Sequence, residues 1–162
     1  MEINSFFGVP AHPLLVHIPV VCIPLATIGV LALAFRPSWR RPYGLVVVAL
    51  AAIGALGAQL ATGSGEALED ERRVRGLGDH PELGELARNV AFILLALVVA
   101  LYVLDRWRNH PRLRGMPHWV VPVVAALTVI GAIGATAAVA AAGHTGAKAV
   151  WEKDSGTAAT GP

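Results

Sequence analysis

The chain has 162 residues, of which 55% are hydrophobic and only 15% are charged. Soluble domains carry about 25% charged residues, so this composition excludes an ordinary water-soluble domain. The net charge of +2 does not indicate a nucleic-acid partner, because the basic residues lie in short segments between apolar runs and not on one soluble surface. The sequence therefore predicts an all-α protein of the lipid bilayer.

Four apolar segments follow one another along the chain, at residues 13–35, 43–63, 86–106 and 119–142. About 20 helical residues cross a hydrocarbon core of ~30 Å, so each segment is predicted to span the membrane once. The N-terminus lacks the basic residues of a signal peptide, and the first helix is expected to remain in the mature protein. The segments predict one four-helix bundle domain over residues 1–151 and a flexible C-terminal tail over 152–162.

A weak internal repeat relates the two halves of the chain. The segment Ile-Gly-Ala-Leu-Gly-Ala at residues 53–58 recurs as Ile-Gly-Ala-Ile-Gly-Ala at 130–135, and His-Pro precedes both the first and the third apolar segment. This pattern predicts two tandem helical hairpins of the same orientation. The competing interpretation is a chance match in a chain rich in alanine and glycine.

Loop charge predicts the orientation of the bundle. The two segments that connect helices one to two and three to four carry seven arginines and one acid, Asp105, whereas the rest of the chain has a net charge of −4. By the positive-inside rule the arginine segments are cytoplasmic, so both termini are expected on the outer side of a bacterial cytoplasmic membrane.

Most of the histidines are predicted to lie on that outer side: His12, His17, His80 and His144. His17 is the strongest candidate for a functional residue, because it is placed inside the first span, where a polar group needs a partner. Gln59, Arg88 and Asn89 are expected at a similar depth, which predicts a polar cluster in the outer half of the bundle. Hydrogen bonding between helices and a functional site both remain open as explanations.

Histidines on facing helices are typical ligands of haem iron. The chain has no Cys-x-x-Cys-His, so covalent haem attachment is excluded. The leading hypothesis is a haem b held by His17 with His80 or His144, in an electron-transfer or accessory subunit. The cations that are available to pair the haem carboxylates are Arg72, Arg73, Arg88 and Lys148. Counted from the span centres, however, His144 is expected about 10 Å further out than His17.

Two alternatives come from other classes of function. The first is a structural or accessory subunit without a cofactor, in which the polar cluster only orders the helices and the chain contacts a redox or other membrane protein partner or a second copy of itself. The second is a transition-metal protein that uses the imidazoles of His12, His17, His80 and His144. His12 and His17 are about 140° apart on a helix, so one metal ion bound by both is not expected.

The first predicted helix also carries a motif. The segment Ala-His-Pro-Leu-Leu-Val-His-Ile-Pro at residues 11–19 resembles the signature of a bacterial four-helix membrane family, the domain of unknown function 2231. The resemblance continues at His80 and Asn89, and at Gly-His-Thr-Gly-Ala over 143–147 with Trp151 beyond it. Ile18 stands where the family has an aromatic residue, and Ala147 stands where it has a second glycine.

This resemblance implies a four-helix fold in a bacterial membrane. It also implies a link to redox chemistry, because some members of the family are fused to Rieske or cytochrome domains. It does not imply a reaction.

Overall fold

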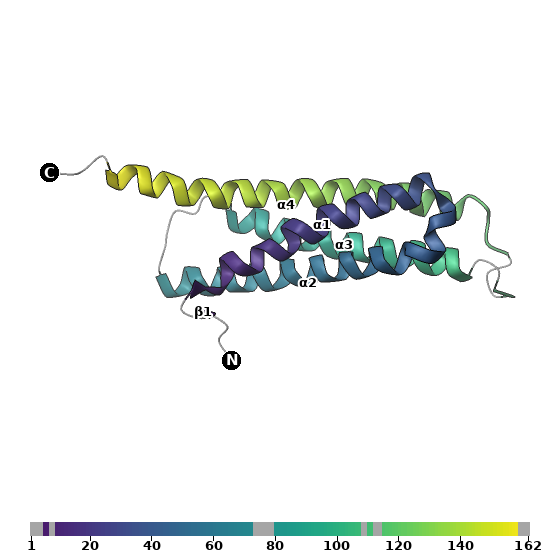
Figure 1. The fold of residues 1–162 in the computed structure, drawn as a ribbon, viewed down its shortest axis with the longest axis horizontal. Helices are drawn as coiled ribbons and strands as arrows, with labels where there is room; N and C mark the ends of the chain where they lie inside the picture. Colours follow the sequence, from purple (N-terminus) through teal and green to yellow (C-terminus); the bar gives the residue numbers. More distant parts are fainter. Residues whose placement is uncertain (1–4, 7–8, 73–79, 108–109, 112–114, 159–162) are drawn as a thin grey trace.

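The computed structural model describes residues 5–6, 9–72, 80–107, 110–111 and 115–158, and the side chains of 14–65, 81–107, 110–111 and 115–148. Four long helices lie side by side in an elongated bundle (Figure 1), namely α1 (Ala11–Phe35), α2 (Arg40–Arg72), α3 (His80–Trp107) and α4 (Val120–Ala158). A short 3-10 helix, η1 (Pro37–Trp39), joins α1 to α2. The strands β1 (Ser5–Phe6) and β2 (Val9–Pro10) pair in antiparallel fashion before α1. The prediction of an all-α four-helix bundle is confirmed.

All four helices are long and apolar enough to cross a membrane. The stretches that meet this condition are Leu14–Phe35, Pro37–Gly65, Pro81–Trp107 and Val120–Lys148. The second and third contain their predicted spans in full, and the first and fourth lack only the first residue of theirs. The agreement follows because the prediction and the bilayer both depend on a long run of apolar side chains.

The helices extend beyond the predicted spans, most of all at the end of α4. The predicted fourth span ends at residue 142, but α4 continues through Gly143 and Gly146 to Ala158. The predicted tail begins at residue 152, so most of it lies within α4, while residues 159–162 lie outside the described residues. Alanine and lysine favour helix around these glycines, which explains why two isolated glycines do not end it.

The helices run alternately up and down, so each end of the bundle has a fixed set of neighbours (Figure 1). The starts of α1 and α3 and the ends of α2 and α4 share one end, which we call the terminal end. The connections from α1 to α2 and from α3 to α4 share the other, which we call the arginine end. Each helix packs against two others, in the order α1, α2, α3, α4 and back to α1.

Glycines allow the helices of each hairpin to approach closely. A side chain added at Gly54 would collide with Ile23 of α1, and one added at Gly57 would collide with Ile18. In the second hairpin, a side chain added at Gly131 of α4 would be in tight contact with Leu97 of α3, whereas one added at Gly134 would be at ordinary contact distance from Val90. The first glycine of each copy therefore faces the first helix of its own hairpin, but the approach of the helices is closer in the first hairpin than in the second.

Threonine hydroxyls link α1 to α4 inside the apolar core. The buried Thr27 Oγ1 lies 3.0 Å from the carbonyl oxygen of Ala132 and 2.8 Å from the hydroxyl of Thr136. It also lies 3.0 Å from the carbonyl of Ile23 in its own helix. Hydrogen bonds between helices replace water as the partner of a polar group in lipid, so these contacts fix the register of α1 against α4.

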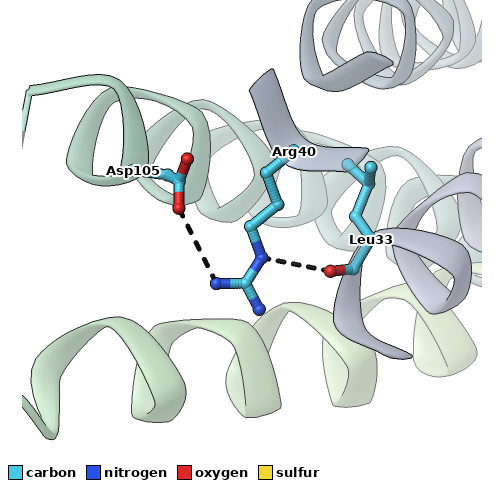
Figure 2. A network of polar contacts seen from close by, with 3 residues as sticks. All are labelled: Leu33, Arg40 and Asp105. Atoms are coloured by element: carbon cyan, nitrogen blue, oxygen red, sulfur yellow. Dashed lines mark hydrogen bonds and ion pairs between the residues drawn. The ribbon is translucent and has the colours of Figure 1, made fainter. Parts of the chain in front are cut away.

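Arg40 closes the arginine end of the bundle (Figure 2). Its Nε donates to the carbonyl of Leu33 in the last turn of α1 at 3.0 Å, and its Nη1 lies 3.9 Å from Oδ1 of Asp105 in α3. Both charged side chains are about nine-tenths buried. Arg40 thus joins the two hairpins and satisfies a carbonyl that the helix end leaves without a partner. From the sequence, both residues count only as charges of the connecting segments.

Replacing Arg40 should destabilise the bundle. Arg40→Met is expected to lower the free energy of unfolding by about 3 kcal/mol, because it leaves the buried Asp105 carboxylate without a counter-charge. Combining it with Asp105→Leu should recover most of the loss. The measurement is unfolding in mixed micelles followed by circular dichroism, with Arg41→Met at the exposed neighbour as the control. Equal stability of the two single variants would contradict this role of the pair.

Candidate functional site

Contacts between α1, α2 and α3 show which polar residues share a level in the bundle. Ile18 of α1 lies against Gly57 of α2, so the preceding residue, His17, is level with the region of Gln59 in the antiparallel helix. The Thr62 hydroxyl of α2 lies 3.5 Å from the carbonyl oxygen of Gly84 in α3. Three residues from Thr62 toward the middle of α2 is Gln59, and three residues from Gly84 toward the middle of α3 is Ala87. Gln59 is therefore level with Ala87, which Arg88 and Asn89 follow. These contacts therefore place His17, Gln59, Arg88 and Asn89 at one level of the bundle.

His144 belongs to the same level. On α1, ten residues separate Thr27 from His17. On α4, the two residues that bond with Thr27 are Thr136 and Ala132, which precede His144 by eight and twelve residues. Because α1 and α4 are antiparallel, the two histidines lie at similar heights above the Thr27 contact. The expectation that His144 lies about 10 Å further out than His17 is wrong for this structure. That expectation assumed upright helices with level span centres, whereas the hydroxyl contacts set another register.

The polar side chains at this level point outward and do not converge in the core. His17, Gln59, Asn89 and His144 are exposed, and Arg88 is half-buried. The interior at this level is filled by small buried residues, Ala58, Ala87, Ala138 and Val139. Within the described side chains, the structure thus brings the predicted residues to one level but spreads them around the outside of the bundle.

Helix geometry divides these residues between two grooves. At 100° per residue, His17 lies about 80° from the side of α1 that carries Thr27, and His144 about 80° from the side of α4 that carries Thr136. Both are turned away from the core, on the outer side of the groove between α1 and α4. We call this pair the histidine flank. In Figure 1, α1 runs obliquely, and it diverges from α4 toward the terminal end, where the histidine flank lies.

The remaining polar residues lie on the opposite groove, between α2 and α3. Gln59 is three residues from Thr62, which contacts α3, and Arg88 is four residues from Gly84, which contacts α2. Arg88 Nε donates to Oδ1 of Asn89 at 3.3 Å. We call Gln59, Arg88 and Asn89 the amide flank. It is separated from the histidine flank by the packed core.

Two other predicted ligands are placed only by their backbone. His12 is the second residue of α1 and His80 the first of α3, both at the terminal end, and their side chains lie outside the described ones. The same holds for Arg72 at the end of α2, while Arg73 lies outside the described residues altogether. Lys148 is exposed on α4, one turn beyond His144. Among the side chains that the structure describes, no three His, Cys, Asp or Glu residues form a group that could hold a metal ion.

Comparison with known proteins gives a family and no reaction. A family model described as "Predicted membrane protein (DUF2231)" matches residues 8–159, which is nearly the whole chain. No curated protein and no solved structure matches the chain.

Proposed function

Because the chain belongs to the DUF2231 family of predicted membrane proteins, whose description carries no reaction, we propose its function from the histidine flank. The protein is a membrane redox subunit that binds haem b at His17 and His144. The observation that carries the proposal is that two exposed imidazoles lie at one level on neighbouring antiparallel helices. Imidazoles from two helices typically hold haem iron, and a haem bound here would supply one-electron transfer.

The surroundings of the histidine flank fit a flat apolar ring better than the core does. The core at this level is closed by alanine and valine side chains, so a haem there would have to displace packed helices. On the flank, the exposed Val20 and Val21 of α1 and the small exposed residues Ala140 and Ala141 of α4 offer an apolar surface next to the histidines. Lys148 lies close enough along α4 to pair with a haem carboxylate. Arg88 takes no part, because it lies on the amide flank.

A second candidate function is a structural or accessory subunit without a cofactor. It is favoured by the closed core, in which alanine packing, glycine contacts and the Thr27 hydrogen bonds join the helices without any added group. In that case the outward polar side chains would contact another membrane protein. The transition-metal alternative with His12, His17, His80 and His144 stays a prediction, because the side chains of His12 and His80 lie outside the described ones.

The visible spectrum separates these functions. The purified protein from haem-replete cells should show Soret and α bands in the reduced state, and His17→Ala or His144→Ala should abolish them because each removes one of the two imidazoles that would hold the haem iron. His118→Ala is the matched control, since this exposed histidine lies at the arginine end. A colourless wild-type protein would contradict the haem proposal, and metal analysis of the same sample would then separate a metal site from a purely structural subunit.

We further propose that the terminal end faces the outside of a bacterial cytoplasmic membrane. The arginine end carries a net charge of +6 in the sequence, and positive loops are retained in the cytoplasm. Both chain termini then lie outside, because the helix ends that lead to them share the terminal end (Figure 1).

A reporter fusion tests this orientation. Alkaline phosphatase fused after Pro162 should be active, because the enzyme matures only outside the cytoplasm, whereas the same enzyme fused after Gly115 should be inactive. The reverse pattern would contradict the proposed orientation while leaving the bundle itself unchanged.

A further inference from the structure

We propose that the amide flank binds the phosphate headgroup of an anionic phospholipid. The proposal concerns Gln59, Arg88 and Asn89 and is independent of the haem proposal, which uses the opposite groove. Three observations carry it, namely the depth of Arg88, its lack of a counter-charge among the described side chains, and the two exposed amides at the same level.

Arg88 lies within the apolar stretch of α3, two residues inside the predicted span that begins at residue 86. A charged group at that depth is unfavourable in hydrocarbon unless it reaches the interface or finds a partner. Side chains on a helix lean toward its N-terminus, and the N-terminus of α3 is at the terminal end. This lean brings the guanidinium of Arg88 within reach of the lipid headgroups on that side of the membrane.

The guanidinium has no carboxylate within 4.0 Å among the described side chains. The one ion pair within that set joins Arg40 to Asp105 at the arginine end. Glu85, one turn closer to the start of α3, is described and exposed but lies beyond that distance. The hydrogen bond that Arg88 makes is to the neutral amide of Asn89, so its positive charge is left for an anion to pair.

The chemistry of the flank suits a phosphodiester. A guanidinium donates two parallel hydrogen bonds to phosphate oxygens, and amide N–H groups donate to phosphate or to the ester carbonyls below it. Gln59 and Asn89 are exposed inside their spans, where lipid tails offer them no hydrogen bonds. A net anionic lipid is favoured over phosphatidylcholine, because the trimethylammonium group of the latter already balances its phosphate.

Native mass spectrometry of the full-length protein in a neutral detergent tests the proposal, with phosphatidylglycerol and phosphatidylcholine as probes. The wild type should retain phosphatidylglycerol in preference to phosphatidylcholine. Arg88→Gln should weaken phosphatidylglycerol binding about tenfold, the size expected for a lost charge-assisted pair. Arg106→Gln, which neutralises an exposed arginine at the other end, should leave it unchanged. Gln59→Leu should weaken binding to a smaller extent and serves as a second variant if Arg88→Gln does not fold.

Three results would overturn the proposal. The first is equal phosphatidylglycerol binding by the wild type and by folded Arg88→Gln or Gln59→Leu. The second is equal affinity of the wild type for the two lipids. The third is displacement of the lipid by millimolar inorganic phosphate, which would assign the flank to a soluble anion.

Discussion

The close approach of α1 to α2 at Gly54 and Gly57 is the contact on which the placement of the polar residues depends. Without side chains at these positions, Ile18 and Ile23 pack directly against the backbone of α2, and this fixes how far one helix slides along the other. The Thr27 contact fixes α4 against α1 in the same way. His17, Gln59 and His144 share a level because these contacts set it.

The hydrocarbon environment explains why polar groups lie where they do. Inside the bundle, Thr27 and Thr128 are buried with carbonyl partners, and Arg40 and Asp105 are buried as a pair. On the outside, the two flanks expose polar side chains at a depth where lipid tails cannot pair with them. A membrane protein retains such groups at some cost in stability, so ligands or partners at both flanks are the physical explanation that we favour.

The sequence predicted the spans well but could not assign the faces of the helices. Span positions follow from composition, because apolar runs of this length have one stable environment. The direction in which Gln59 or Asn89 points depends on which side of each helix meets its neighbour, and in a bundle packed by alanine nearly every side can do so. The Arg40–Asp105 pair was missed for another reason. Both charges lie at span ends, where the sequence alone indicates contact with water.

Spin labelling in bilayers tests the outward placement of the two flanks most directly. Single cysteines at positions 17, 59, 89 and 144, in a Cys22→Ser background, would carry nitroxides whose collisions with oxygen and with a water-soluble nickel complex report exposure and depth. The structure predicts similar depth at all four positions and oxygen access like that at the exposed Ile53, well above that at the buried Ala91. Oxygen access at 17 and 144 as low as at 91 would mean that the histidines face the core.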